Sequence, residues 1–155
     1  MKTKHKYILL FSVIAFVVAT DLITKALFGN IEYIKVIPGF FYFETNNGNY
    51  GAAWGILSGK KWLLILIGIV GIGMMFVLDH MLKNKSKLFT IGLGMFIGGA
   101  LGNLIDRIAL GYVRDFINFE FWKTFPTFNL ADSFLCVAIV LICIHFIFST
   151  SKDKK

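Results

Sequence analysis

The stretch "FNLADSFLCVAIVLICIHFIF" (residues 128–148) decides the fold, because it is long and apolar enough to cross a bilayer. It nevertheless carries an aspartate, Asp132, close to its start. A carboxylate beside lipid is costly, so it must be neutralised, paired with another group or used in chemistry. The stretch therefore predicts a membrane helix, and it raises the question of what Asp132 does there.

The overall composition agrees with a membrane protein. Of the 155 residues, 57% are hydrophobic and only 16% are charged, and the mean hydropathy is +0.73. These values exclude an ordinary soluble globule and indicate a chain whose surroundings are mostly lipid. The length suits one domain. We therefore expect residues 1–155 to form a single integral-membrane domain.

Four hydrophobic runs are long enough to span a bilayer, which takes about 20 residues of helix. The first run follows basic residues, as in a secretory signal, but its apolar register continues past Ala19 to Leu27 without a small-x-small cleavage site. We interpret it as a retained helix. The sequence thus predicts a mainly α-helical bundle of four transmembrane helices, covering about residues 7–28, 61–81, 88–108 and 129–150.

The positive charge is concentrated at the ends of these hydrophobic runs. Nine of the sixteen basic residues form three short lysine clusters at alternate boundaries, which is the pattern of cytoplasmic segments. The net charge of +7 therefore indicates membrane topology rather than nucleic-acid binding. Both termini are predicted to be cytoplasmic, with residues 29–60 and 109–128 outside. The clusters are Lys2, Lys4 and Lys6; Lys83, Lys85 and Lys87; and Lys152, Lys154 and Lys155.

The two outer segments differ in pattern. In the first, "IEYIKVIPGFFYFET" (residues 31–45) combines partial alternation with a central Pro-Gly, which predicts two short strands around a turn. In the second, the crowded aromatic residues of "FINFEFWKTFPTF" (residues 116–128) predict an amphipathic piece at the membrane interface. An aromatic belt and a substrate-gripping surface explain these rings equally well.

The predicted topology brings four carboxylates to one side of the membrane. At 1.5 Å per residue, Asp21 lies about 21 Å along the first helix and Asp106 about 27 Å along the third, both toward the outside. Asp115 follows the third helix, and Asp132 begins the fourth, which runs inward. We expect all four near the outer leaflet, although they come from separate parts of the chain.

Each of these charges also has a purely structural explanation. Asp21 and Lys25 are spaced i,i+4 and can neutralise each other along one helix. Asp106 can pair with a nearby arginine, and either Asp132 or the asparagine three residues before it can cap the fourth helix. Asp79 alone falls at the inner boundary, where the Lys83 cluster is its expected partner. The arginines near Asp106 are Arg107 and Arg114.

The side chains expected near the outer carboxylates limit the chemistry. His5, His80 and His145 are predicted at the inner side, and neither Cys136 nor Cys143 is expected to reach the carboxylates. We therefore predict no metal or cofactor and no Cys–His or Ser–His nucleophile. A close carboxylate pair remains: one member keeps a proton, and the other activates water. This is the chemistry of aspartic proteases.

Five short motifs occur in an order that is similar to one known family. The chain resembles lipoprotein signal peptidase, the bacterial type II signal peptidase, along nearly its whole length. Any one motif is weak evidence, but five in order on a four-span chain are specific. The matching stretches are "DLITK" (21–25), "NYGAAWG" (49–55), "GGALGNLIDRI" (98–108), "VRDFI" (113–117) and "FNLADS" (128–133).

The resemblance implies an aspartic endopeptidase of the bacterial cytoplasmic membrane, with its active site near the extracytoplasmic face. It implies that Asp115 and Asp132 are the catalytic dyad, and that prolipoproteins are cut just before a cysteine carrying diacylglycerol. The first outer segment would be a small β-cradle and the second a flap. Supporting or substrate-contacting residues would be Asp21, Lys25, Asn49, Gly51, Asn103, Asp106, Arg107, Asn129 and Ala131.

Several roles can be assigned in physical terms. Asn103 and Asn129 can hold a substrate backbone or orient a carboxylate without adding charge. Arg107 can bind Asp106 or brace the outer loop through both guanidinium nitrogens. In "TNNGNYGAAWG" (residues 45–55) two Asn-x-Gly registers occur, and we choose Asn49 over Asn46 because Ala-Ala-Trp follows it.

Two other classes of protein remain open at this point. A small proton-coupled carrier would use the intramembrane charges as a relay, and a structural assembly subunit would use them to lock helices together. Against the carrier, no chain of polar residues continues inward through the second and fourth helices. The carrier's relay would be Asp21, Lys25, Asp106 and Arg107.

For the peptidase, we expect a monomer that is surrounded by membrane lipid and acts on lipid-modified prolipoproteins.

Overall fold

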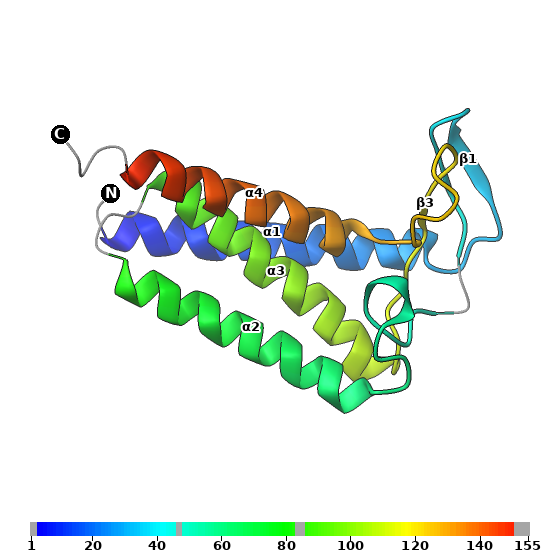
Figure 1. Ribbon diagram of the computed structural model, residues 1–155, viewed down its shortest axis with the longest axis horizontal. Coiled ribbons are helices and arrows are strands. Elements are labelled where there is room, and N and C mark those ends of the chain that lie inside the picture. Colours follow the sequence, from blue (N-terminus) through cyan, green and yellow to red (C-terminus); the bar gives the residue numbers. More distant parts are fainter. Residues whose placement is uncertain (1–2, 46–47, 83–85, 151–155) are drawn as a thin grey trace.

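Four long helices form a bundle in a computed structural model that describes residues 3–45, 48–82 and 86–150. Both termini lie at one end of the bundle, and a small sheet lies at the opposite end, the sheet end (Figure 1). The four predicted spans are confirmed, except that the first helix begins earlier, at Thr3. The helices are α1 (Thr3–Phe28), α2 (Lys61–Met81), α3 (Lys87–Ala109) and α4 (Leu130–Thr150).

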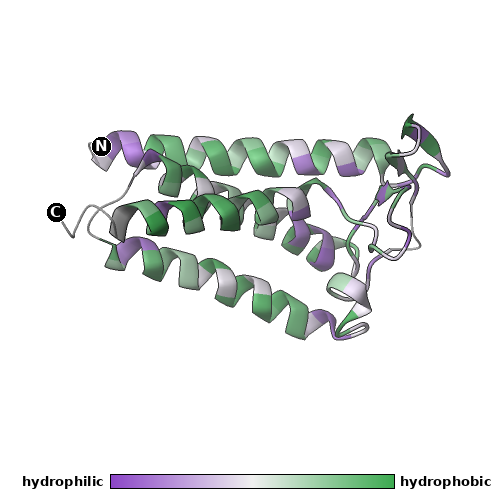
Figure 2. Ribbon diagram, turned by 45° about the horizontal axis from the view of Figure 1, so that its top comes forward, coloured by the Kyte–Doolittle hydropathy of each residue, from purple (hydrophilic) through white to green (hydrophobic). Residues whose placement is uncertain are grey.

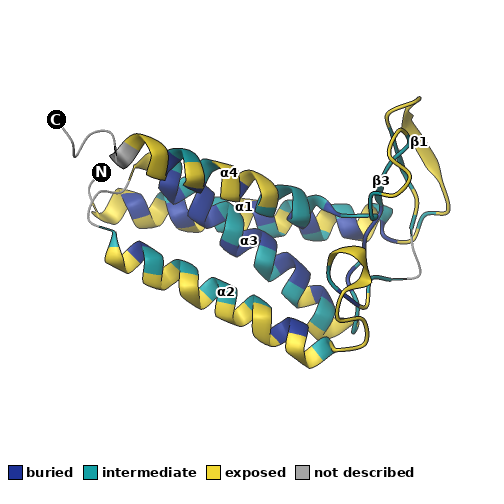
Figure 3. Ribbon diagram, viewed as in Figure 1, coloured by how far each residue is buried: buried dark blue, intermediate teal, exposed yellow. Residues whose placement is uncertain are grey.

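All four helices are long and apolar enough to cross a membrane. Hydrophobic residues dominate their surfaces, and hydrophilic residues gather near the bundle ends (Figure 2). The helix α3 is central, because 56% of its most apolar window is buried against 17–22% for the others. Figure 3 shows buried residues along α3 and a largely exposed α2. The exposed apolar side chains of α2, such as Trp62 and Met74, therefore suit contact with lipid.

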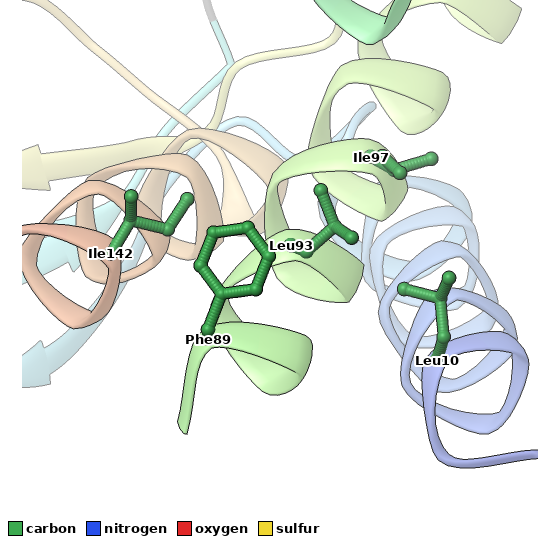
Figure 4. Close-up of a cluster of buried hydrophobic side chains, with 5 residues drawn as sticks. All are labelled: Leu10, Phe89, Leu93, Ile97 and Ile142. Carbon is green, nitrogen blue, oxygen red and sulfur yellow. The ribbon is translucent and has the colours of Figure 1, made fainter. Parts of the chain in front are cut away.

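A compact hydrophobic cluster holds α1, α3 and α4 together in the half of the bundle nearer the termini (Figure 4). The rings and branched chains come from three helices, so the cluster fixes their mutual positions rather than any one helix alone. Its buried members are Leu10, Phe89, Leu93, Ile97 and Ile142.

Glycines allow α3 to approach its neighbours closely. A side chain at Gly94 or Gly98 would meet Val13 or Val17 of α1, and one at Gly99 would meet the backbone of α4. Small residues spaced four apart are a common way for membrane helices to pack, since the hydrophobic effect does not drive association in lipid. These glycines therefore serve helix packing.

Gly102 is a glycine whose replacement should be costly, because it packs against the Asp21 carboxylate. A methyl group there would overlap the Asp21 carboxylate, whereas one at Gly73 would meet open space. We expect Gly102→Ala to destabilise the protein by about 1–3 kcal/mol through overpacking. Gly73→Ala should be neutral or slightly stabilising, since alanine favours the helix. Thermal unfolding of both variants in detergent checks this, and equal midpoints would contradict it.

The sheet has three short antiparallel strands, β1 (Ile34–Ile37), β2 (Phe41–Phe43) and β3 (Ile117–Phe119), in that order. The predicted hairpin is confirmed: β1 pairs with β2 around a turn in which Gly39 adopts φ +76°. The third strand comes from the second outer segment, where Phe43 pairs with Ile117. That segment was expected only as an amphipathic surface piece, so its strand is a correction.

The end of the bundle near the termini has its own ion pair between helices. Lys6 of α1 donates to Asp79 of α2 at 2.6 Å, and both residues are buried. Asp79 therefore ties α2 to α1, a contact that the sequence pattern did not predict. Its expected partner Lys83 lies outside the described residues, as do Lys2, Lys85, Lys152, Lys154 and Lys155.

Candidate functional site

Asp115 is held in the short connection between α3 and β3. The chain is fixed just before it by an antiparallel bridge between Val113 and Asn49. The Asp115 side chain is buried and accepts two hydrogen bonds, from Asn49 Nδ2 at 2.8 Å and from Asn129 Nδ2 at 2.6 Å. Each carboxylate oxygen thus has a neutral amide partner, and no basic side chain forms an ion pair with it within the described residues.

Asp132 lies in the first turn of α4, and Asn129 stands at the N-cap of that helix. The Asp132 N–H donates to Asn129 Oδ1 at 3.0 Å, and the Asn129 N–H donates to Asp132 Oδ2 at 3.3 Å. This reciprocal arrangement is a capping box, which satisfies two otherwise free N–H groups. Both capping explanations offered by the sequence are therefore correct, because Asn129 and Asp132 cap α4 jointly.

Capping leaves Asp132 available for other contacts. Its second oxygen, Oδ1, accepts a hydrogen bond from Asn103 Nδ2 at 2.7 Å. The Asn129 amide, which caps the helix through its oxygen, donates through its nitrogen to Asn103 Oδ1 and to Asp115 Oδ1. Asn129 therefore links the two aspartates, and Asn103 supports the same arrangement from α3. The structure brings these four polar residues together as the sequence analysis expected.

A second group of charged side chains contacts Asn103 through Lys25. The Lys25 ammonium is fully buried, donates to Asp21 Oδ2 at 2.7 Å and to Asn103 Oδ1 at 2.9 Å, and lies 3.8 Å from Asp106. Asp21 also accepts from the backbone N–H of Ala131 in α4 at 3.0 Å. These contacts join α1, α3 and α4 at one level of the bundle, so the expected convergence of intramembrane charges is found.

Arg114, not Arg107, is the arginine that pairs with Asp106. Arg114 donates to Asp106 through Nη2 at 2.7 Å, through Nε at 3.2 Å and through its backbone N–H at 3.0 Å. The hydrogen bonds with this carboxylate raise the pKa of the Arg114 guanidinium. Sequence analysis had named Arg114 only as one alternative for this role and had not placed it among the site residues.

Arg107 instead reaches the loop that precedes α2. Its Nη2 donates to Gly51 O at 2.9 Å, so it contacts the outer loop through one hydrogen bond and not through the expected pair of nitrogens. Its Nε is buried without a hydrogen-bond partner among the described residues. Such an orphaned donor beside a cavity is costly unless a bound molecule satisfies it.

The same loop is organised by Asn49. Its side-chain oxygen accepts from the Gly51 N–H at 2.9 Å, while its amide nitrogen donates to Asp115. A side chain at Gly51 would collide with the backbone of Gly55, which explains why this position is small. Asn49 therefore supports Asp115 directly, whereas the alternative, Asn46, lies outside the described residues.

A cavity of about 740 Å³ opens on both aspartates. Its walls are mostly apolar and come from α3, from α4, from the loop before α2 and from the aromatic segment that includes and follows β3. Cys136 lies on the wall, one helical turn after Asp132, so one cysteine lines the cavity although none was expected near the carboxylates. The lining includes Trp54, Arg107, Asp115, Phe119, Phe125, Phe128, Asp132, Leu135 and Cys136.

The environment of Asp115 favours its protonated form. Burial, and next the negative charge of Asp132, raise the pKa of Asp115 to about 7, although the amides of Asn49 and Asn129 act in the opposite direction. A raised carboxyl pKa beside a second carboxylate is the arrangement that acid–base chemistry at neutral pH requires. The cavity thus offers a proton donor, a hydrogen-bonded carboxylate and an orphaned arginine nitrogen together.

All eleven predicted site residues lie at this end of the bundle. Three of them contact the site through neighbours: Ala131 through its N–H, Gly51 through its carbonyl and N–H, and Asp21 through Lys25. The aromatic wall formed by Trp54 and Phe125, whose ring centroids lie 6.1 Å apart, was not assigned to the site in advance. Only the crowding of aromatic residues in the outer segments could have indicated it.

The fold and the site define a multi-pass membrane protein of four helices, with a carboxylate-bearing cavity at the sheet end. The signal peptidase (SPase) II family matches residues 13–148. The chain belongs to the signal peptidase II family, and it is therefore a membrane-embedded hydrolase, a peptidase of lipoprotein processing.

Two solved structures are similar over nearly the whole chain. One, described as a bacterial membrane enzyme at 2.3 Å resolution, is 34% identical with a TM-score of 0.80 and covers 92% of this chain and 90% of its own. Another, a bacterial membrane enzyme at 1.9 Å, is 33% identical with a TM-score of 0.79 and covers 88% and 91%. The same architecture thus occurs in bacterial membrane enzymes.

Proposed function

We propose that this protein is an aspartic endopeptidase that removes signal peptides from prolipoproteins by cutting before the diacylglyceryl-modified cysteine. The observation that carries the proposal is the shared cavity, in which Asp115 and Asp132 face one space and are linked through Asn129. Family membership supplies the substrate class, and the geometry supplies the candidate catalytic groups.

The two carboxylates differ in surroundings, which suggests a division of roles. Asp132 lies in the first turn of α4, where its Oδ2 accepts the Asn129 N–H, and it faces the same cavity as Asp115. Asp115 has a pKa raised to about 7 by burial and by Asp132, so it holds a proton more readily. We assign Asp132 as the general base and Asp115 as the general acid.

Hydrolysis then proceeds without a covalent intermediate. Water attacks the carbonyl carbon before the modified cysteine and gives a proton to Asp132, while Asp115 donates its proton to the carbonyl oxygen. When the tetrahedral intermediate collapses, the C–N bond breaks and the proton on Asp132 passes to the departing cysteine nitrogen. The hydroxyl proton returns to Asp115. The products are the signal peptide with a new carboxyl end and the lipoprotein with a free amine.

The surrounding polar residues would position the substrate. The Arg107 Nε, buried without a partner among the described residues, can donate to a substrate carbonyl oxygen. The amides of Asn49, Asn103 and Asn129 hold the carboxylates in place without changing their total charge. The apolar wall that includes Leu135 and Cys136 suits the aliphatic parts of a lipid-modified substrate.

We further propose the topology that the lysine clusters favour. Both termini would face the cytoplasm of a bacterium, and the sheet end would lie at the extracytoplasmic face of the inner membrane. The chain would act as a single domain and as a monomer, without nucleic acid, metal or cofactor. The first outer segment, which holds the β1–β2 hairpin, would be the cradle, and the second, residues 109–128, would be the flap that covers the cavity.

The charges that a proton carrier would use are arranged differently from a relay. Asp21 and Asp106 are balanced by Lys25 and Arg114 in one group, and Arg107 faces the cavity at the sheet end. The remaining buried ion pair, Lys6 with Asp79, lies at the other end of the bundle. This arrangement supports a site at one membrane face rather than a path across the membrane.

The pH dependence of cleavage should reflect the pair. Above pH 7 the rate should fall about ten-fold per unit, because Asp115 loses the proton that it must donate. Initial rates of cleavage of a lipidated peptide, measured from about pH 4 to about pH 9, give this profile. A rate that keeps rising above pH 8 would contradict Asp115 as the acid.

The test of the proposed function is a cleavage assay on purified protein. A synthetic prolipoprotein peptide with a diacylglyceryl-modified cysteine should be cut, and the same peptide without the lipid should not. Sealed vesicles containing the protein should show no aspartate-dependent proton flux. Flux without proteolysis would overturn the proposal in favour of the carrier.

A further inference from the structure

A second cavity adjoins the site on the side away from the helices. It measures about 660 Å³, and Asp115 lies on its wall as well as on the wall of the larger cavity. Asp132 lines only the larger one. The two cavities therefore meet at Asp115. They share Asn49, Ala52, Trp54, Asp115, Phe125, Pro126 and Thr127.

The second cavity is built entirely from the loops outside the four helices. Its lining residues fall between 48 and 58 and between 115 and 127, and none belongs to α1, α2, α3 or α4. The larger cavity, by contrast, includes Asn103 and Arg107 of α3 and Leu135 of α4. The larger cavity thus adjoins the membrane-spanning part, and the smaller one lies on the loop side.

If the peptide bond to be cut is held at Asp115 and Asp132, the chain before that bond and the chain after it would lie in different surroundings. The signal peptide before the cysteine is a hydrophobic segment and suits the helix side, where α3 and α4 form the wall. The chain after the cysteine is destined for water and suits the cavity formed by loops. This cavity is therefore the natural place for the first residues of the mature lipoprotein.

Lys123 is the basic residue on the wall of this loop-side cavity. It is exposed, and no carboxylate lies within ion-pair distance of its ammonium in the part of the chain that the structure describes. The nearby Glu120 is already engaged, since it accepts from Lys35 Nζ at 3.0 Å and from the Gly39 N–H at 2.7 Å. The positive charge of Lys123 is therefore available to interact with a ligand.

We infer that Lys123 is a specificity-determining residue that favours prolipoproteins with acidic residues directly after the modified cysteine. This inference rests on the proposed function and deepens it. An acidic residue in the loop-side cavity would meet the unpaired ammonium, whereas a basic residue would be repelled by it. Asp115 on the same wall keeps a proton, so it opposes an acidic substrate less than an ionised carboxylate would.

The experiment uses three lipidated peptides that differ only in the three residues after the cysteine: all Asp, all Ser or all Lys. At low salt, kcat/KM should decrease in that order, by about two- to five-fold per step, the size expected for one exposed ion pair. The differences should shrink as salt is added, because exposed charges are screened. Lys123→Gln should flatten the order, and Lys123→Glu should invert it.

A matched control separates a local effect from net charge. Lys87→Gln removes one positive charge from an exposed position at the other end of the bundle and should preserve the order. Equal rates for the three peptides, or an unchanged order in Lys123→Gln, would overturn this inference while leaving the proposed function intact. Failure to cleave any of the three would overturn the proposed function and this inference with it.

Discussion

Replacement of Asp115 or Asp132 by asparagine is expected to lower kcat for cleavage of a lipidated prolipoprotein peptide by at least about 10³-fold. Asparagine keeps the size of the side chain and one accepting oxygen, but it can neither take a proton from water nor donate one to the carbonyl oxygen. Both variants should insert and fold, since the amide oxygen can still accept one of the two hydrogen bonds that each aspartate accepts.

A carboxylate elsewhere at the sheet end serves as the control. Glu32 is exposed and lies on the wall of a different cavity, so Glu32→Gln should cleave at the rate of the unaltered protein. Initial rates and a thermal unfolding midpoint should be measured for all three variants. Retained cleavage in either aspartate variant, with a normal midpoint, would rule out that residue as half of the pair.

The second large effect concerns stability. Lys25 is fully buried and lies between Asp21 and Asp106, so Lys25→Met should cost about 3–5 kcal/mol by leaving the buried Asp21 carboxylate without its cation, whereas Asp106 keeps Arg114. The unfolding midpoint in detergent should fall by roughly 6–20 °C. Methionine nearly preserves the volume of the lysine stem, so a cavity does not explain such a loss.

A double variant distinguishes a charge effect from a packing effect. Combining Lys25→Met with Asp21→Asn removes one unpaired carboxylate and should recover part of the lost stability, which a packing defect would not allow. A midpoint for Lys25→Met within about 2 °C of the unaltered protein would contradict the buried ion pair as a stabilising element.

The membrane architecture could be read from the sequence because it depends on local composition. Runs of apolar residues specify spanning helices whatever their neighbours, and the three helix ends at Phe28, Met81 and Ala109 agree with the predicted spans to within one residue. The sequence also predicted that the four carboxylates lie at one side of the membrane, because the rise per residue of a helix converts sequence position into depth in the bilayer.

Long-range pairing was harder to predict. Nothing in residues 117–119 specifies that they join β2 as a third strand, because strand pairing depends on partners far away in the sequence. Likewise, the choice of Arg114 over Arg107 for Asp106 depends on how the chain turns after α3, where Gly111 adopts φ +91°. Sequence spacing alone leaves both arginines within reach.

The cavity was the least predictable part of the site. Its walls combine α3, α4 and two loops, so residues such as Trp54 and Cys136 become neighbours only after folding. Cys136 was not expected near the carboxylates, yet one helical turn places it on the same face as Asp132 and on the cavity wall. A helical-wheel comparison of the two positions would have found it.

Asn129 shows how local and functional structure depend on the same atoms. Its oxygen caps α4, and its nitrogen supports both Asp115 and Asn103. The start of the helix and the geometry of the aspartate pair are therefore set together. This explains why a helix this apolar begins with polar residues: the cap positions Asp132 at the cavity.

The most direct test of the aspartate pair is mass spectrometry of the products formed from a diacylglyceryl-modified prolipoprotein peptide. The unaltered protein should give one cut, with a signal peptide that ends immediately before the cysteine and a lipidated fragment that begins with it. Neither product should form with Asp115→Asn or Asp132→Asn. A cut at another bond, or the same products from either variant, would contradict the account.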